Sequence, residues 1–294
     1  MSMPTDVGIV DCMIGFPSPN PFENYAFFRD NIKDKESKAT TFPVEYLFKH
    51  NVPGAADPEV DPIATTLGQM DQYNIDIGLI GCQDPVGQQA LREHPTRFVG
   101  QVHVDPNDVV GAVRSIREAK QRYDVRAVGA FPAGCTPQVP ISDPKWYPVY
   151  ATCVELDLPI FMCAGIPGPR LPSMCQHVEM IDIVCYDFPD LVFVTRHGCQ
   201  PWTELMVKLM LKWPNLHYST SAFAPKHYDQ RIIDYANTRG ADRVIYAGYF
   251  PMGLTLSRIM GDMPHVPFQA TVWPKFLRDN ARRVLKLDER PLGG

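Results

Sequence analysis

The chain has 294 residues, of which 45% are hydrophobic and 21% charged, and its formal net charge is −5. This composition suits one large globular domain. A slightly acidic chain without a long basic run gives no electrostatic reason to expect nucleic acid as a partner. No run of about 18 apolar residues is present, so we expect no membrane span.

The cysteines predict a reducing compartment. They are scattered, and no CxxC pair occurs among them. The start of the chain has no basic segment followed by an apolar one, so we expect no secretory signal. We therefore expect free thiols and a cytoplasmic location. The cysteines are Cys12, Cys82, Cys135, Cys153, Cys163, Cys175, Cys185 and Cys199.

The first predicted strand, Val7–Cys12, is followed by a long irregular segment, residues 14–62. The segment is rich in Pro, Asn, Phe and Tyr, and we expect short helices in it, including one over Glu45–His50. Loops longer than about 15 residues are usually functional, so the segment is a candidate lid or oligomer contact. We expect a homo-oligomer, a dimer. The aromatic side chains of the segment can instead simply pack it down on the rest of the fold.

After this segment, predicted helices and strands alternate. The strands are apolar runs bounded by Gly, Pro or Asp, and several helices carry apolar residues at helical spacing. The remaining predicted strands are Ile75–Gly81, Phe98–Val104, Val125–Phe131, Pro159–Gly165, Leu191–His197, Leu216–Ser221 and Arg243–Tyr249. The predicted helices are Ile63–Tyr73, Gly87–His94, Asp108–Arg122, Trp146–Leu156, Val178–Tyr186, Glu204–Lys212, Gln230–Thr238 and, within a helical tail over 275–294, Lys275–Leu287.

This alternation predicts an α/β fold with eight parallel strands, each followed by a helix or a helix-bearing loop. Over about 250 residues, such a pattern is typical of a (β/α)8 TIM barrel formed by a single domain. A doubly wound open sheet would need a glycine-rich phosphate turn after its first strand, and Asp11–Pro17 is not one.

The stretch Leu191–Glu204 predicts a functional position. It consists of a buried strand, a tight turn at Gly198 and the start of a helix at Pro201. In folds with parallel strands, ligands bind outside the carboxyl ends of the strands, so His197 lies where chemistry usually happens. The alternative is a core histidine that is hydrogen-bonded to a neighbouring carbonyl.

Several motifs together resemble one known family. They are Asp143–Gly165 (DPKWYPVYATCVELDLPIFMCAG), Phe188–Trp202 (FPDLVFVTRHGCQPW), Pro214–Ser221 (PNLHYSTS), Asp242–Pro251 (DRVIYAGYFP) and the run NARRVL at 280–285. They resemble the strand segments and C-terminal signature of the amidohydrolase-related family, which includes aminocarboxymuconate semialdehyde decarboxylases, resorcylate-type decarboxylases and small-ring lactonases. The resemblance covers most of the chain outside 14–62 and implies a TIM-barrel enzyme with a small-molecule substrate.

The metal-ligand positions of that family are replaced. The two histidines of its Asp-x-His-x-His motif match Met13 and Gly15, the histidine of its fifth strand matches Cys163, and the aspartate of its eighth strand matches Tyr249. Only His197 fills its family position. A thioether is a poor zinc ligand and glycine offers none, so we expect no metal and no other cofactor.

The alternation of side chains along a strand gives two expectations. Cys12 is one residue out of phase with Met13 and should point away from the pocket. Arg196 is adjacent to His197, so it faces either the pocket or the helix layer, and the sequence leaves that choice open.

Without a metal, the resemblance implies that His197 is a general acid or base, because an imidazole with a pKa of about 6.5 can do both. Tyr249 can polarise a carbonyl as a donor, or can merely fill the space of the ion. Cys163 can be a nucleophile if His197 lowers the pKa of its thiol, or can be inert and buried. We take these three as the candidate catalytic residues.

A second group of residues is predicted to bind substrate. Arg170 follows the fifth strand, where its guanidinium suits capture of a carboxylate, with a surface salt bridge as the alternative. Asp11 can touch substrate or hold the first strand in place. The other candidates are Met13, Arg196 and His177, whereas His103 and His217 are expected to be structural.

Three functions stay open. The first is a metal-independent hydrolase or decarboxylase-type lyase that acts on a small carboxylated or cyclic substrate, with His197 as general acid or base. The second is a non-catalytic descendant that binds a ligand or supports a partner enzyme through residues 14–62. The third is a zinc-dependent hydrolase with atypical ligands. The retained His197 favours the first, and the loss of four ligand positions favours the second.

Overall fold

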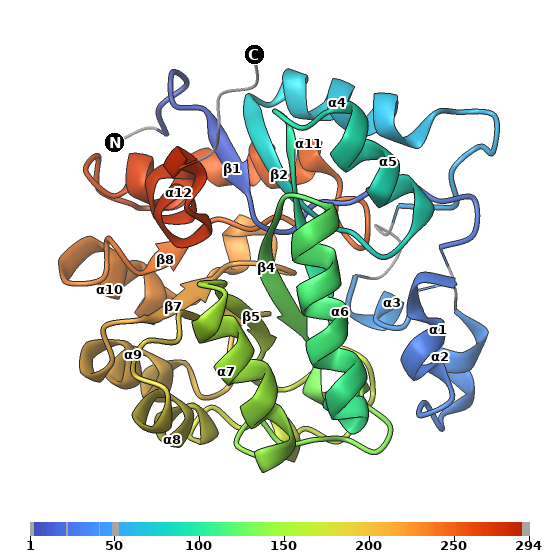
Figure 1. Ribbon diagram of the computed structural model, residues 1–294. Helices are drawn as coiled ribbons and strands as arrows, with labels where there is room; N and C mark the ends of the chain where they lie inside the picture. Colours follow the sequence, from blue (N-terminus) through green and yellow to red (C-terminus); the bar gives the residue numbers. More distant parts are fainter. Residues whose placement is uncertain (1–2, 22, 41, 49–52, 290–294) are drawn as a thin grey trace.

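The computed structural model describes residues 3–21, 23–40, 42–48 and 53–289. Eight parallel strands form one sheet in which each strand pairs with the next in chain order (Figure 1). The strands are β1 (Ile9–Asp11), β2 (Ile75–Gly81), β3 (Phe98–His103), β4 (Val125–Ala130), β5 (Ile160–Cys163), β6 (Phe193–Arg196), β7 (Leu216–Ser219) and β8 (Val244–Ile245).

The sheet curls until its first and last strands meet. The backbone N–H of Gly15 donates to the carbonyl of Phe250 at 2.9 Å, and Ile14 forms a parallel bridge with Phe250. The eight-stranded α/β barrel that the alternation predicts is therefore confirmed. β1 and β8 are shorter than predicted, because the chain leaves regular pairing at the seam between them.

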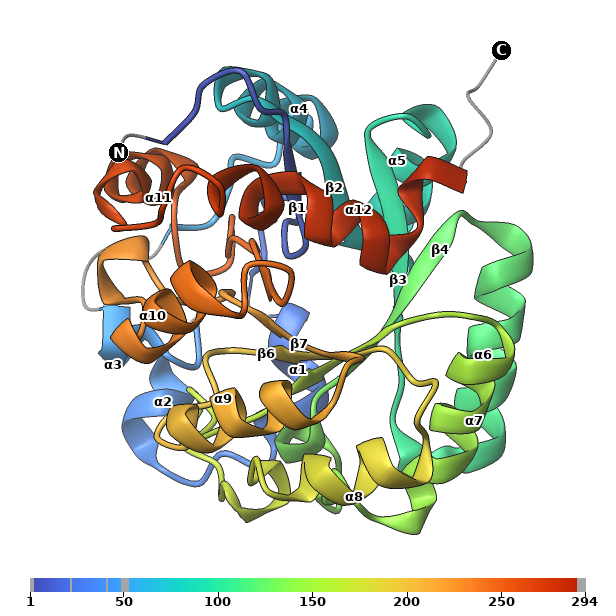
Figure 2. The same cartoon turned by 90° about the vertical axis from the view of Figure 1, so that its left-hand side faces the viewer.

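Helices surround the barrel (Figures 1 and 2). Asp61, Asp84 and Asp108 cap three of them by accepting hydrogen bonds from first-turn N–H groups, as helix N-caps do. These helices are α4 (Pro62–Gln72), α5 (Pro85–Glu93), α6 (Val109–Arg122), α7 (Tyr147–Glu155), α8 (Met180–Asp187), α9 (Thr203–Lys212), α10 (Gln230–Thr238), α11 (Leu256–Asp262) and α12 (Asn280–Leu285). None of the helices in the described ranges has the length and apolar character needed to cross a lipid bilayer.

The C-terminal helix α12 closes the amino end of the barrel. Its Val284 and Leu285 pack against Val10, Phe161 and Val194, which point inward from three strands. A short π-helix over Lys275–Asp279 leads into α12. The carboxyl ends of the strands therefore remain as the open end of the barrel.

The segment after β1 carries three short helices, α1 (Ala26–Arg29), α2 (Lys35–Ala39) and α3 (Glu45–Phe48). The predicted helix Glu45–His50 corresponds to α3, and its last two positions lie outside the described residues. The rings of Phe28 and Phe131 are 5.5 Å apart, so the segment packs on the loop after β4. Figure 1 shows α12 and the group α1–α3 on different sides of the molecule.

Candidate active site

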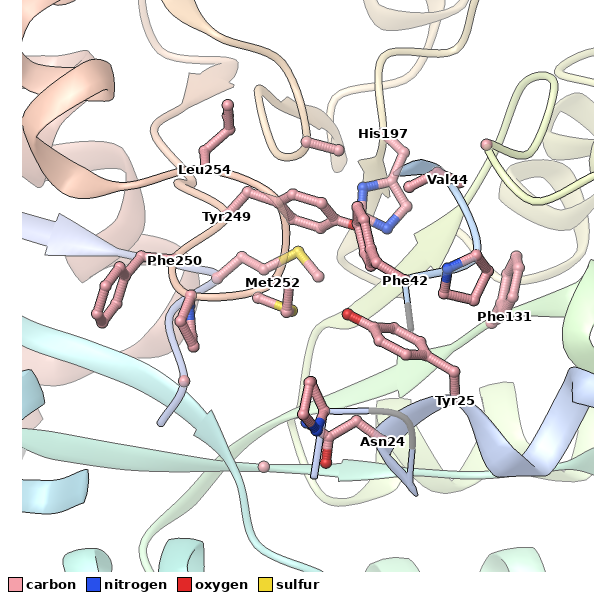
Figure 3. Close-up of a pocket in the computed structure, with 18 of the residues that line it drawn as sticks. Asn24, Tyr25, Phe42, Val44, Phe131, His197, Tyr249, Phe250, Met252 and Leu254 are labelled. Carbon is pink, nitrogen blue, oxygen red and sulfur yellow. The ribbon is translucent and has the colours of Figure 1, made fainter. Parts of the chain in front are cut away.

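A cavity of about 2110 Å³ opens at the carboxyl ends of the strands (Figure 3). Ligand pockets usually measure roughly 300–1,000 Å³, so a small ligand would occupy only part of it. The strand ends form its floor, and aromatic residues of the segment after β1 form much of its wall. Of the residues singled out in the sequence, the cavity lining includes Met13, Cys163, Arg196, His197 and Tyr249.

Arg196, the last residue of β6, points into the barrel and not toward the helix layer. Its guanidinium lies 5.1 Å from the centre of the Phe161 ring, and its Nη2 donates a hydrogen bond to Oε1 of Gln101. Arg196 is only 3% exposed. The sequence did not decide whether Arg196 faces the pocket or the helix layer, and the structure shows that it faces the pocket. Its positive charge therefore lies at the floor of the cavity.

His197 faces the same cavity although it follows Arg196 directly. Simple alternation fails here because the strand ends at Arg196 and the chain turns left-handed: φ is 63° at His197, 87° at Gly198 and 56° at Cys199. Non-glycine residues adopt positive φ at a cost in free energy, and such strain is typical of functional sites. The turn brings two consecutive nitrogen-bearing side chains into one cavity.

Ser221 orients the imidazole of His197. Its Oγ lies 3.1 Å from Nδ1 of His197 and also accepts a hydrogen bond from the His197 backbone N–H. His197 is therefore not a core histidine bonded to a carbonyl. Burial, followed by the positive charge on Arg196, lowers the pKa of His197 to about 3. The ring is therefore neutral at neutral pH and keeps a free lone pair, but a pKa this low makes it a weaker base than an ordinary imidazole.

Tyr249 packs against His197, with ring centroids 5.7 Å apart. Burial raises the pKa of the Tyr249 phenol, so it stays protonated and can donate a hydrogen bond. Its ring also contacts Phe42 and Phe48 from the segment after β1, at 6.2 and 6.1 Å. Figure 3 shows His197, Tyr249 and Phe42 close together, and the Tyr25 ring lies beside Phe42, with centroids 5.4 Å apart.

Cys163 lines the cavity as a thiol. Burial raises its pKa to about 12, although the positive charge on Arg196 opposes this shift. A nucleophilic thiolate needs a lowered pKa. The hypothesis that Cys163 is a nucleophile requires His197 to lower the pKa of its thiol. His197 is not among the causes of the pKa shift, so the structure does not support that hypothesis.

Sequence reasoning missed Gln101 and treated His103 as structural. Both residues line the cavity from the end of β3, and their Nε2 atoms are 2.6 Å apart. A Cβ at Gly129 on the neighbouring β4 would overlap Gln101 and would come within 2.7 Å of the His103 ring. The signal available in the sequence was the spacing of two polar residues on one face, at the carboxyl end of a predicted strand.

Two other candidates lie away from the cavity lining. Arg170 forms ion pairs with Asp34 at 3.2 Å and Glu36 at 2.8 Å, which corresponds to the salt-bridge alternative. The His177 ring packs on Trp202 with centroids 4.1 Å apart.

Asp11 joins the two ends of the sheet. Its Oδ1 accepts hydrogen bonds from the backbone N–H groups of Met13 at 2.9 Å and Gly248 at 2.8 Å, and the residue is fully buried outside the cavity lining. Burial raises the pKa of its carboxyl group to about 7. Cys12 packs inside the barrel with Val10, two residues earlier on the same face, and it is absent from the cavity lining that includes Met13. It therefore points away from the pocket, as the alternation along the strand predicts.

The residues present do not fit the metal that the resemblance implies. The matching positions carry Met13, Gly15, Cys163 and Tyr249, which offer one thioether, one thiol and one phenol. Within the described ranges, no group of three or more His, Cys, Asp or Glu side chains is arranged to hold a metal ion. A zinc site needs about three or four nitrogen, oxygen or thiolate ligands.

Comparison with solved structures shows the same fold. An uncharacterised TIM-barrel protein from Bordetella bronchiseptica is 20% identical, with a TM-score of 0.77 over 97% of this chain and 100% of that one. The 2,6-dihydroxybenzoate decarboxylase from Rhizobium is 16% identical, with a TM-score of 0.66 over 96% and 99%. The 5-carboxyvanillate decarboxylase from Novosphingobium aromaticivorans, complexed with manganese and 4-hydroxy-3-methoxy-5-nitrobenzoic acid, is 16% identical, with a TM-score of 0.65 over 96% and 97%.

Comparison of the sequence itself gives the family. No curated protein matches it. A family model described as Amidohydrolase matches residues 49–287, which is most of the chain and includes seven of the eight barrel strands. The family that the strand motifs resemble is thereby confirmed, and this chain belongs to the amidohydrolase family.

Proposed function

We propose that the protein is a metal-independent hydrolase or carbon–carbon lyase that acts on a small carboxylated or cyclic substrate. The observation that supports this most is the meeting of a neutral imidazole, a protonated phenol and a guanidinium in one cavity, from His197, Tyr249 and Arg196. They supply a proton acceptor, a hydrogen-bond donor and a positive charge, which are the elements of acid–base chemistry on a carbonyl.

Hydrolysis of a lactone illustrates the roles. A water molecule attacks the carbonyl carbon while the free Nε2 of His197 accepts its proton. Tyr249 donates a hydrogen bond to the carbonyl oxygen as negative charge develops on it. The ring C–O bond then breaks, and His197 returns the proton to the leaving oxygen. In a decarboxylation, the C–C bond to the carboxylate breaks and carbon dioxide leaves, while Tyr249 and Arg196 stabilise the negative charge that stays on the substrate. A proton from water then takes the place of the carboxylate on that carbon.

Two measurements test the proposal. Elemental analysis of the purified protein should find well under one equivalent of metal, and chelator should leave turnover unchanged. His197→Ala should abolish turnover of lactones or carboxylated substrates with nearly unchanged Tm, because Ser221 is its only hydrogen-bond partner among the described residues. His177→Ala, which changes a histidine outside the cavity lining, is the matched control and should keep full turnover.

Either of two results contradicts the proposal. Stoichiometric metal whose removal abolishes turnover would restore a metal-dependent hydrolase with atypical ligands. Full turnover by His197→Ala would remove the acid–base residue from the reaction.

A non-catalytic ligand-binding protein is the second candidate. The replacement of four family ligand positions favours it, and failure of the wild-type protein to turn over any lactone or carboxylated substrate would support it. In either case, we propose a cytoplasmic homodimer. The eight cysteines are free and buried, which supports a reducing compartment.

A further inference from the structure

Arg196 is a buried cation that forms no ion pair with any residue in the described ranges. It is 3% exposed, and its Nε has no hydrogen-bond partner in the described parts of the chain. The groups that interact with it are the Gln101 amide, the Phe161 ring, the thiols of Cys12 and Cys163 and the neutral imidazoles of His103 and His197, none of which is a carboxylate. A buried charge is costly unless an opposite charge and hydrogen bonds compensate it, so this arrangement calls for an anion from outside the chain.

The guanidinium is held in place from behind. Gln101 accepts a hydrogen bond from Arg196 and contacts Nε2 of His103 with its own amide nitrogen. Gly129 leaves the room that this pair needs. An oriented guanidinium can present two parallel N–H groups, the geometry that binds a carboxylate through both of its oxygens.

The wall above this floor is apolar and aromatic. The rings of Phe42, Phe48 and Tyr249 lie within 6.2 Å of one another between centroids. Since Tyr249 also packs on His197, the aromatic wall and the acid–base residue border the same space. A planar apolar body fits against such a wall, because aromatic faces stack favourably.

We propose that Arg196, supported by Gln101 and His103, is a carboxylate-binding subsite for a planar acid whose apolar body lies against Phe42, Phe48 and Tyr249. The subsite deepens the proposed function by naming the group that a substrate must carry. The positioning residues are Gln101 and His103, which act through the guanidinium.

Binding of two small probes tests the subsite without any turnover. Benzoate and benzamide have the same planar shape and differ in charge. Calorimetric titration of the wild-type protein should show benzoate binding more tightly than benzamide by about ten- to hundredfold, the range expected for hydrogen bonds to a charged group. A buried pair resists screening, so the preference should survive in 0.5 M salt, whereas a diffuse surface field would be screened.

Single substitutions show which residue causes the preference for benzoate over benzamide. Arg196→Met should bring the ratio of the two affinities to about one, since a thioether of similar length offers no charge. Gln101→Leu should lower the ratio through loss of orientation, and it provides the test if Arg196→Met fails to fold. Arg117→Met is the matched control: this arginine is paired with Glu155 on the helix layer and is not part of the cavity lining, so the ratio should stay at its wild-type value.

Three outcomes would overturn the subsite: equal binding of both probes by the wild-type protein, a preference that survives in Arg196→Met, or a preference lost in Arg258→Met instead. The last variant changes a half-buried arginine elsewhere in the cavity lining. The test is independent of catalysis, because the affinities for benzoate and benzamide are measured without turnover. A failure of the subsite is therefore distinguishable from a failure of His197 as the acid–base residue.

Discussion

Ser221 decides which nitrogen of His197 is available to a ligand. The serine hydroxyl lies beside Nδ1, so Nε2 is the nitrogen without a protein partner among the described residues. The backbone N–H of His197 donates to the same oxygen, which ties the ring and its left-handed backbone to the turn after β7. A catalytic imidazole needs this kind of support, because proton transfer depends on its direction as well as its pKa.

Ser221→Ala should therefore lower kcat by about tenfold or more while leaving Tm within a few degrees of wild type. Steady-state kinetics and thermal unfolding measure the two effects. Ser219→Ala is the matched control, since that hydroxyl donates to the carbonyl of Thr195 inside the barrel wall and not to His197. Equal losses of kcat in the two variants would show that Ser221 supports the barrel and does not orient the imidazole.

The barrel was predictable from sequence because parallel strands buried on both faces leave continuous apolar runs. The predicted starts and ends of β2 and β3 lie within one residue of those observed. The side chains that form the site were harder to predict from the sequence. Periodicity places a side chain on one of two faces, but the turn after Arg196 brings both Arg196 and His197 inward, and no periodic pattern reports a positive φ.

Tertiary partners account for the remaining differences. Arg170 has the chemistry of a carboxylate-binding residue, yet its ion pairs are with residues 136 and 134 positions earlier in the chain, Asp34 and Glu36. Gln101 carries no catalytic signature by itself. Its significance comes from contact with Arg196, which is 95 residues further along the chain.

Contacts between the segment after β1 and the loop after β5 hold part of the cavity wall in place. Arg170 pairs with Asp34 and Glu36 of the segment, and its guanidinium lies 4.4 Å from the centre of the Tyr46 ring. The Tyr46 hydroxyl donates to the carbonyl of Gly168 at 2.7 Å. These contacts are largely exposed, so we propose that the segment opens as a lid without unfolding of the barrel.

Arg170→Met should accordingly increase protease cleavage within the segment while leaving Tm almost unchanged, because exposed ion pairs contribute little to the free energy of unfolding. Limited proteolysis with mass spectrometry maps the cut sites. Arg117→Met removes an exposed pair with Glu155 on the helix layer and is the matched control. If both variants gave the wild-type cleavage pattern, these contacts would not be what holds the segment closed.

At the scale of the whole molecule, buried ionisable groups couple stability to pH. His217 on β7 is 5% exposed, its Nδ1 has no hydrogen-bond partner in the described chain, and Arg243 and Arg283 lie nearby. Burial, followed by these two positive charges, lowers the pKa of His217 from 6.5 to about 3. Between these values the unfolded chain binds a proton that the folded chain does not, so the free energy of unfolding falls as pH falls.

Asp11 acts in the opposite direction. Burial raises the pKa of its carboxyl from 3.8 to about 7, so between these values the folded state holds a proton that the unfolded state has lost. Its contribution to stability is therefore greatest at low pH and declines as pH rises toward 7. The net pH dependence combines the contribution of Asp11 with those of His217, His103 and His197, whose pKa values are all lowered to about 3. Single substitutions separate the contributions.

His217→Phe, which keeps a ring in the barrel wall without a titrating group, should lose less Tm than wild type between pH 7 and pH 4, with a difference of roughly 5 °C. Asp11→Asn should steepen the loss, because it removes the group that gains stability on acidification. Calorimetric scans at several pH values measure both slopes. Parallel curves for wild type and His217→Phe would mean that His217 titrates normally in the folded barrel, and that its burial does not couple folding to pH.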